Sequence, residues 1–304
     1  MEQNVSVVPV TGPQPTVPSA PFIASGNEWG FFVLRAGSIS IRGGFVHSLM
    51  INISNLSYAF GTGSSRTPVF SELSMNVQRG EFISVVGGSG CGKSTLFKII
   101  AGLLEPDNGR ITLNGAESAT AAKRLGSVAY MPQQDLLLPW RTVMDNCLLP
   151  WELKRSRPKA AAVAEIRTLL QRFGLEGTEG AYPQELSGGM RQRVAVLRTV
   201  AAGNDLLLLD EPFGALDAIT KRSLQRWLLE LWAELDKTVL FITHDLEEAL
   251  LLSDRIYLMT GSGGGMQEFP AGLPRPRHHS LNYQPQFAAL RQELELKLYE
   301  NRRS

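Results

Sequence analysis

The apolar residues of this chain follow two periods, one typical of strands and one typical of helices. Continuous or period-2 apolar stretches predict strands over Ile51–Tyr58, Phe82–Val86, Val128–Met131, Leu206–Leu209, Val239–Ile242 and Ile256–Met259. Helical spacing, in most cases ended by a glycine, predicts helices over Ser94–Ala101, Ala160–Phe173, Met190–Ala202, Ile219–Leu235 and Phe287–Tyr299. Strands that alternate with helices indicate an α/β fold with a largely parallel sheet covered on both faces.

The segment 1–49 lacks this regular pattern. It is rich in proline, glycine and small polar residues, which bury little apolar surface, so we expect most of it to be disordered. The regular pattern begins at Met50, and we expect a chain that starts there to fold and function as the full chain does. The alternative is a docking arm, because Trp29 and residues 31–34 form an apolar cluster that could contact a membrane protein or lipid.

Composition narrows the class of protein. The chain has 304 residues, 43% of them hydrophobic, which is ample for a buried core. Its 30 Lys and Arg nearly balance 29 Asp and Glu, so no overall field draws it to nucleic acid or to anionic lipid. Two cysteines do not form a secreted disulfide framework and fit a reducing cytosol. We see no signal peptide and no apolar run near the roughly 20 residues of a membrane helix.

A glycine-rich sequence lies between the strand predicted over 82–86 and the helix that follows. It consists of Gly87, Gly88, Ser89, Gly90, Cys91, Gly92, Lys93, Ser94 and Thr95. This matches the P-loop pattern, in which backbone N–H groups and a helix N-terminus surround phosphates. We expect Lys93 to bridge the β- and γ-phosphates of ATP and Ser94 to ligate Mg²⁺. A plain glycine-rich turn is the alternative. We also expect the Cys91 thiol to react with maleimide and to be protected by MgATP.

Two acids follow the buried strand predicted over 206–209. Asp210 and Glu211 stand at the carboxyl end of that strand, where ligands bind in open α/β sheets. Asp210 is suited to the Mg²⁺ shell, and Glu211 to accepting a proton from an attacking water. Acids after a strand can also serve only to solvate a loop, but the P-loop favours the catalytic interpretation.

Residues 186–193, Leu-Ser-Gly-Gly-Met-Arg-Gln-Arg, resemble the signature motif of ABC ATPases. The resemblance implies a P-loop NTPase core with a mostly parallel sheet, an antiparallel β subdomain and a helical signature subdomain. It also implies that Ser187, Gly188 and Gly189 bind the γ-phosphate held by the P-loop of a partner subunit. Two ATP molecules would then lie between the subunits of a homodimer.

Four further positions resemble the family in order. Gln133 is similar to the glutamine that contacts Mg²⁺ or water, and Asp217 to an aspartate that contacts the partner subunit. His244 resembles the switch histidine, which contacts the γ-phosphate. Phe60 resembles the aromatic that stacks on adenine, and Tyr58 is a second candidate because residues 61–67 interrupt the spacing. Core packing for the aromatics, and an ordinary solvated role for His244, are the alternatives.

Three short segments, 137–143, 252–256 and 273–277, resemble the corresponding segments in the ATPases of nitrate, sulfonate and taurine importers. The resemblance implies two integral-membrane permease subunits, a solute-binding protein and a peripheral location on the cytoplasmic face of the inner membrane. The ATPase domain is expected over 50–280, its helical subdomain over about 134–187 and a C-terminal amphipathic helix over 281–304. That subdomain should offer a groove to the permease.

Two rival functions belong to other classes. An ABC ATPase of translation or DNA repair moves no solute, but such proteins usually carry tandem cassettes or a long coiled coil. A P-loop kinase for a small molecule would have no use for the signature at Ser187. The sequence identifies neither the solute nor, except through resemblance, the direction of transport.

Overall fold

The computed structural model describes residues 48–61, 66–214, 216–235, 237–260 and 265–303. The predicted disorder or docking arm in the N-terminal segment therefore lies outside the described residues, apart from its last two positions. Residues 62–65, within the interruption after Phe60, and residues 261–264 also lie outside them.

The larger sheet carries five of the six strands that the hydrophobic pattern predicts, and the sixth, predicted over Ile51–Tyr58, lies in the other sheet. Its order is β10-β9-β3-β8-β7-β6, and its strands pair in parallel except for β10, which is antiparallel to β9. The strands are β3 (Phe82–Gly87), β6 (Ala129–Met131), β7 (Leu206–Asp210), β8 (Thr238–Thr243), β9 (Arg255–Met259) and β10 (Met266–Pro270). Every residue of β3, β7 and β8 is buried, as continuous apolar runs in a sheet with two covered faces should be.

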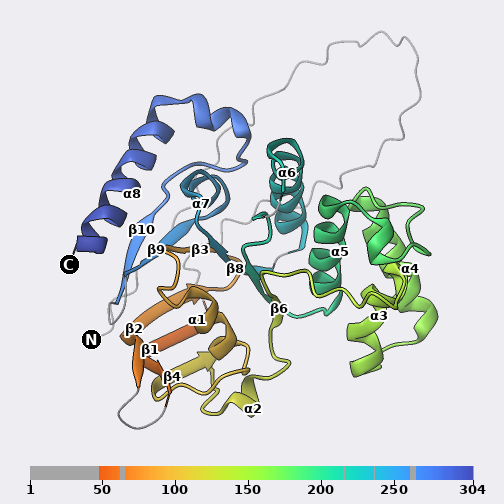
Figure 1. The fold of residues 1–304 in the computed structure, drawn as a ribbon, viewed down its shortest axis with the longest axis horizontal. Coiled ribbons are helices and arrows are strands. Elements are labelled where there is room, and N and C mark those ends of the chain that lie inside the picture. The colour runs from red at the N-terminus through yellow and green to blue at the C-terminus, as the bar shows by residue number, and fades with distance from the viewer. Residues whose placement is uncertain (1–47, 62–65, 215, 236, 261–264, 304) are drawn as a thin grey trace, which may run out of the picture. The chain divides into compact units, whose positions relative to one another are not determined.

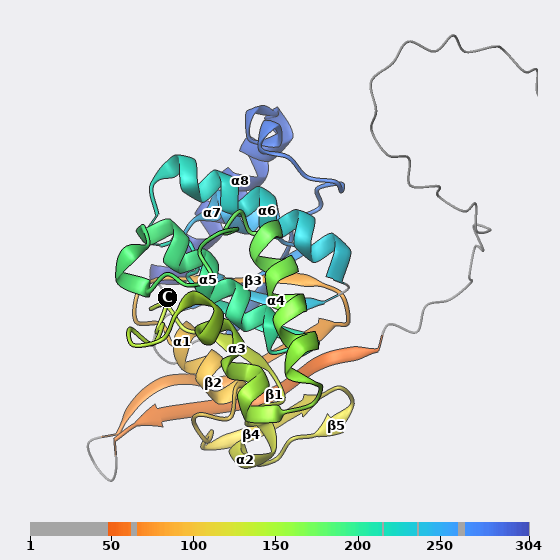
Figure 2. The ribbon, with the colours of Figure 1, turned by 90° about the vertical axis from the view of Figure 1, so that its right-hand side faces the viewer.

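A second, antiparallel sheet packs against the first through α1 (Lys93–Ile100). Its order is β2-β1-β4-β5, visible across the lower part of Figure 2. Its strands are β1 (Leu49–Phe60), β2 (Thr67–Gln78), β4 (Asn108–Leu113) and β5 (Ala116–Glu117). Alternating residues of β1, β2 and β4, including Ile53, Leu73 and Ile111, are buried beneath α1 with one face of the larger sheet.

The other face of the larger sheet is covered by a helical group beyond β6 and by α6 (Figure 1). That group contains α3 (Val143–Lys154), α4 (Lys159–Arg172) and α5 (Gly188–Ala201), with the short 3₁₀ helix η2 (Pro183–Glu185) leading into α5. α6 spans Ala218–Leu235, and α2 (Ala121–Arg124) lies near the antiparallel sheet. Alternation along β3 sends Phe82 to this face and Ile83 to the face beneath α1, so both faces are buried.

The C-terminal part adds a third cluster of apolar contacts. α7 (Leu246–Leu252) follows β8, and η3 (His279–Tyr283) leads into α8 (Pro285–Arg303). Phe287 and Leu294 of α8 are buried against Phe269 of β10 and Leu250 of α7. Within the described residues, no helix is both long and apolar enough to cross a membrane.

Candidate functional site

The phosphate loop connects the end of β3 to the first residue of α1. Gly92 has φ 101°, and a Cβ added there would lie 2.5 Å from a methyl group of Val69. A Cβ on Gly87 would lie 2.7 Å from both the Cys91 sulfur and the Met259 carbonyl oxygen. Glycine is therefore required at both positions by the close approach of neighbouring atoms. The strand, loop and helix follow one another as the sequence predicts.

Lys93 closes the loop on itself. Its side chain is 7% exposed, and its Nζ donates to the carbonyl oxygens of Gly87, at 2.9 Å, and Gly88, at 2.8 Å. The ammonium is thus held at the centre of the turn, where a phosphate would compete for it. Cys91 is only 4% exposed and its sulfur faces Gly87, which argues against the rapid maleimide reaction expected from the sequence. This residue can offer the phosphate its backbone N–H, whereas its thiol belongs to the core.

Asp210 ends β7 beside the first turn of α1. It is 2% exposed, its Oδ2 accepts from the Tyr130 hydroxyl at 3.4 Å, and it also bonds the Ser94 side chain. Burial is the main reason that the pKa of Asp210 lies above its usual value, although the Ser94 bond acts in the opposite direction. The other oxygen, Oδ1, is buried and has no hydrogen-bond partner.

This arrangement fits a magnesium ion. An unpartnered buried carboxylate oxygen is costly on its own, and Mg²⁺ prefers oxygen ligands. The Ser94 hydroxyl and the Asp210 carboxylate lie on adjoining elements, as the sequence-based Mg²⁺ hypothesis requires. The amide oxygen of Gln133 is the third candidate ligand, because the amide nitrogen of the same side chain contacts the neighbouring Glu211 at 3.2 Å.

Three residues predicted to be catalytic meet at one carboxylate. Glu211 Oε2 lies 3.2 Å from Gln133 Nε2 and 3.3 Å from His244 Nδ1. They come from the ends of β7, β6 and β8, which lie side by side in the sheet, so parallel pairing brings their carboxyl ends together. The Glu211 side chain is 19% exposed and that of His244 is 65% exposed, so water can reach this carboxylate.

Glu211 has an unusual backbone conformation. Its φ is 46°, in the left-handed region, and its N–H donates to the Ile242 carbonyl oxygen of β8 at 3.0 Å. Left-handed backbone costs a residue with a Cβ about 1–2 kcal/mol. Strain of this kind concentrates at functional sites, where the surrounding structure holds it in place. No sequence signal indicated this conformation.

The signature residues lie apart from this cluster, at the start of α5. Ser187 is exposed and caps the helix, accepting at its Oγ from the Met190 N–H at 3.3 Å, and Gly188 is exposed beside it. Asp217 is exposed before α6, where hydrogen bonds to the Thr220 side chain and backbone hold its pKa below the usual value. Among the described residues, no hydrogen bond or ion pair joins the signature residues or Asp217 to the phosphate loop.

The two aromatic candidates for the adenine contact separate clearly. Phe60 is 50% exposed at the end of β1, so simple core packing does not describe it. Tyr58 packs against the core and has its ring centroid 6.4 Å from that of Phe70. The two candidate rings contact each other edge to face, with centroids 5.0 Å apart. The accessible ring therefore belongs to Phe60.

The structure adds residues that sequence reasoning missed. Tyr130 bonds Asp210, and Arg198 donates to the carbonyl oxygens of Asp135, at 2.6 Å, and Leu136, at 2.8 Å, in the loop after Gln133. Burial lowers the pKa of Arg198, against the opposing effects of Cys147 and Asp135. The one available signal for Arg198 was a charge within the apolar stretch of a helix.

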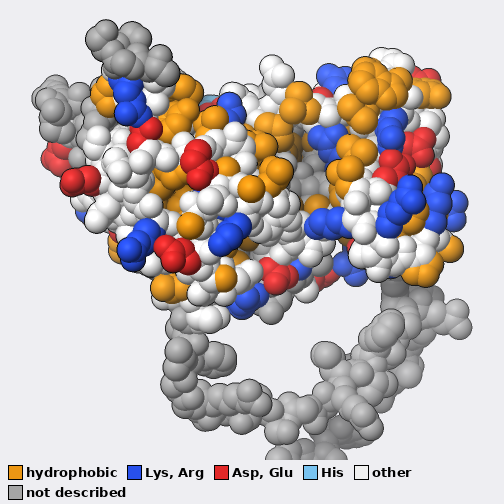
Figure 3. Space-filling view, turned by 90° about the horizontal axis from the view of Figure 1, so that it is seen from below, with side chains coloured by type: hydrophobic (Ala, Val, Ile, Leu, Met, Phe, Trp, Pro, Cys, Tyr) orange, Lys and Arg blue, Asp and Glu red, His pale blue; other side chains and the backbone are white. Residues whose placement is uncertain are grey.

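A groove of about 550 Å³ lies between α3, α5 and the edge of the larger sheet. Figure 3 looks at the molecule from below and shows hydrophobic side chains on both sides of the hollow next to the helical group on the right. Three leucines that line the groove are unusually exposed: Leu103 at 53%, Leu136 at 55% and Leu153 at 80%. Such apolar surface on a charged exterior is typical of a contact site for another protein.

Comparisons with known proteins identify the family that this chain resembles. Residues 70–214 match the family model described as ABC transporter. The formylaminopyrimidine import ATP-binding protein ThiZ of Halalkalibacterium halodurans is 40% identical over 83% of this chain and 97% of its own length. The aliphatic sulfonates import ATP-binding protein SsuB of Bacillus licheniformis is 41% identical, over 78% of this chain and 89% of its own length. The taurine import ATP-binding protein TauB of Escherichia coli O157:H7 is 38% identical, over 83% and 98% respectively.

A solved structure shares the fold. The dimeric ATP-binding cassette MJ0796, in a post-hydrolysis state bound to ADP and Pi, has a TM-score of 0.66 and 28% sequence identity. The similarity covers 74% of this chain and all of that one. The predicted P-loop fold, with its parallel core sheet, antiparallel sheet and helical part, is therefore confirmed.

Proposed function

Because the chain belongs to the ATP-binding subunits of ABC importers and is an ATPase of that family, we propose that MgATP hydrolysis by it drives uptake of a small anionic solute. We propose that the ATPase domain spans residues 50–280, with its helical subdomain at about 134–187 and a C-terminal helix over 281–304. The observation that carries the proposal is the meeting of Gln133 and His244 at the Glu211 carboxylate, beside buried Asp210.

The chemistry assigned to the site uses these side chains in order. Lys93 exchanges its two carbonyl partners for phosphate oxygens, and the N–H groups of the loop surround the phosphates. Glu211 accepts a proton from the attacking water, while His244 and Gln133 orient the water and the γ-phosphate. Ser94, Asp210 and Gln133 would hold Mg²⁺, which when bound supplies charge that stabilises the phosphate oxygens.

A homodimer completes the proposed site. Ser187, Gly188 and Gly189 lie at a helix N-terminus, which suits them to bind a phosphate. Their separation from the phosphate loop of the same chain is what an arrangement in trans requires. Asp217 is exposed and available for a partner contact. Phe60 is assigned to the adenine ring because its side chain is half exposed at a strand end.

The groove between α3 and the sheet edge is the proposed contact for a permease subunit. Leu136 lies three residues after Gln133, and Arg198 holds the backbone between them to α5, so movement of this loop reaches the groove directly. Two permease subunits, a solute-binding protein and a position on the cytoplasmic face of the membrane complete the assembly that we propose.

The solute class rests on similarity to other proteins, both over the whole chain and in short motifs. Proteins whose names include formylaminopyrimidine, aliphatic sulfonates and taurine are 40%, 41% and 38% identical to this chain, values too close to separate the three. The motifs after Gln133 and His244 favour the nitrate, sulfonate and taurine group, and we propose a solute of that group.

A transport assay in a strain that lacks the gene tests the proposal. Uptake of labelled nitrate, an alkanesulfonate, taurine and formylaminopyrimidine is measured after complementation with the wild type or with Glu211→Gln. We expect the wild type, and not the variant, to restore uptake of one anionic solute. Restored formylaminopyrimidine uptake would overturn the anionic class. Purified protein that transfers phosphate to a small molecule and releases none from ATP alone would favour a kinase.

A further inference from the structure

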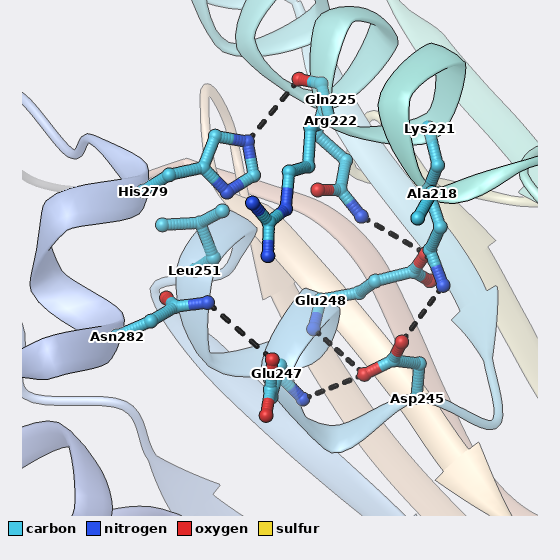
Figure 4. Close-up of a pocket in the computed structure, with 10 residues that line it drawn as sticks. All are labelled: Ala218, Lys221, Arg222, Gln225, Asp245, Glu247, Glu248, Leu251, His279 and Asn282. Atoms are coloured by element: carbon cyan, nitrogen blue, oxygen red, sulfur yellow. Dashed lines mark hydrogen bonds and ion pairs between the residues drawn. The ribbon is translucent and has the colours of Figure 1, made fainter.

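A polar pocket of about 190 Å³ lies behind the loop that carries His244, between α6, α7 and η3. Figure 4 shows its lining, in which Lys221 of α6 points down toward the carboxylates of Asp245 and Glu248. The Lys221 Nζ lies 2.7 Å from Asp245 Oδ2 and 2.7 Å from Glu248 Oε1. One ammonium thus bridges two carboxylates at the start of α7.

Glu248 is a buried charge. Its side chain is 5% exposed, and its Oε1 also accepts from Gln225 Nε2 at 3.0 Å. An isolated carboxylate at this depth would be costly, and the bridge and the amide bond offset that cost. Burial alone would lower the pKa of Lys221, but the bonds to Asp245 and Glu248 raise it above its usual value, so this side chain stays charged.

The cluster holds both neighbours of His244 in the sequence. Thr243, on one side, donates its hydroxyl to Glu248 Oε2. Asp245, on the other side, donates its N–H to the Thr243 hydroxyl at 3.0 Å, and its Oδ1 caps α7 by accepting from the N–H groups of Glu247 and Glu248. The His244 side chain is left 65% exposed and touches Glu211 at 3.3 Å.

The anchor for this loop is a well-packed helix. Lys221 lies in the first turn of α6, where its N–H donates to the Asp217 carbonyl oxygen at 2.9 Å. Leu224 and Leu228 of the same helix are buried in the core. Lys221 therefore connects the loop around His244 to a rigid element rather than to another loop.

We propose that Lys221 is a positioning residue for ATP hydrolysis, which fixes His244 against Glu211 by bridging Asp245 and Glu248. This inference rests on the proposed function, because it requires His244 to act in hydrolysis. The alternative is that Lys221 only neutralises the buried Glu248 and so stabilises the fold.

The experiment measures steady-state and single-turnover phosphate release, ATP affinity and thermal unfolding on the full chain. The variants are Lys221→Met, Lys221→Arg and Lys221→Met with Glu248→Gln. Lys237→Met is the matched control, because Lys237 also pairs with an aspartate, at 2.9 Å, and is 22% exposed against 24% for Lys221, but lies at the opposite end of β8. His244→Ala provides a second background.

We expect Lys221→Met to lower kcat by about 10²-fold, the order seen when a catalytic group is misplaced by about 1 Å, with ATP affinity changed by less than about threefold. Lys221→Arg should recover most of the rate, and Lys237→Met should match the wild type. The double variant removes the ammonium and the buried Glu248 carboxylate together, so no buried carboxylate is left without its cation, and it should recover thermal stability but remain slow. In the His244→Ala background, Lys221→Met should lower kcat little further, because Lys221 and His244 act as a unit.

Three results would overturn the inference: a double variant that recovers both stability and rate, equal losses in both backgrounds, or a Lys221→Met rate equal to that of Lys237→Met. If the His244→Ala rate is too low to measure, the first and third comparisons decide. A His244→Ala enzyme as fast as the wild type would instead remove the premise, which separates failure of the proposed site from failure of this inference.

Discussion

Glu211→Gln changes one carboxylate oxygen to an amide nitrogen and leaves the shape of the site intact. Gln133 Nε2 at 3.2 Å and His244 Nδ1 at 3.3 Å both face Glu211 Oε2, and an amide oxygen can still accept from either group. The amide cannot accept a proton from water. We therefore expect kcat to fall by about 10²–10⁴, the range for loss of a general base, which corresponds to about 3–5 kcal/mol of barrier.

Binding and folding should be nearly unaffected by this change. The phosphate contacts assigned to Lys93 and to the loop do not involve Glu211, so ATP affinity should stay within about threefold. The side chain is 19% exposed and the backbone strain at this position is the same for glutamine, so unfolding free energy should change by less than about 0.5 kcal/mol. Hydrolysis that fails while binding persists should also leave an ATP-bound dimer, visible by sedimentation.

The measurement is phosphate release under steady-state and single-turnover conditions, with ATP affinity from equilibrium titration. The matched control is Glu247→Gln, which makes the same carboxylate-to-amide change at a glutamate on α7 that forms an ion pair with Arg291 at 2.7 Å. That change should leave kcat unaltered. A Glu211→Gln enzyme within about threefold of the wild-type kcat would refute the assignment of Glu211 as the base. A variant that loses ATP affinity and turnover in equal measure would point to a binding role instead.

Further predictions concern the metal, the thiols and the groove. Burial raises the pKa of Asp210, so its protonated form stabilises the apo protein at low pH, and that contribution is lost as the pH rises through the raised pKa. Conversely, Mg²⁺-dependent nucleotide affinity should weaken as the pH falls through that pKa, and titrations of Asp210→Asn should show no such dependence. Cys91 and Cys147 are buried, and burial raises the pKa of Cys147 to about 12. Maleimide should therefore label both thiols only in urea, as measured by mass spectrometry. Fast, ATP-sensitive labelling of native Cys91 would contradict this prediction. Leu153→Glu should abolish copurification with a membrane partner and leave the ATPase rate of the isolated subunit unchanged. Leu296→Glu on α8, 56% exposed, should leave both copurification and the ATPase rate unchanged.

The sequence predicts best what is local. The buried strand β3, the glycine turn and α1 follow one another along the chain, so their pattern alone defines the phosphate loop. The strand ends that carry Gln133, Glu211 and His244 were also predictable, because parallel strands align their carboxyl ends. Those side chains converge on one oxygen because their strands are neighbours in the sheet. No single motif predicts that strand order.

The elements that the pattern missed have physical reasons. β4 has only Ile111 and Leu113 buried, which is too little for a periodic signal. β2 does alternate, with Leu73, Met75 and Val77 buried between exposed polar residues, and this short period-2 pattern was overlooked. α3 contains Pro150, which the helix accommodates near its C-terminal end but which argues against a helix in the sequence. The Lys221 cluster depends on α6 meeting α7, a tertiary contact between residues more than 20 positions apart.

The left-handed backbone of Glu211 limits how this protein can be selected for stability in the laboratory. Glycine adopts φ 46° without steric cost, so a library selected for heat resistance alone would accumulate glycine at position 211. Each of those clones would gain about 1 kcal/mol from relief of the backbone and would lack the carboxylate at the centre of the site. Selection therefore has to score turnover and heat resistance in the same round, and the gains in stability have to come from positions elsewhere in the chain.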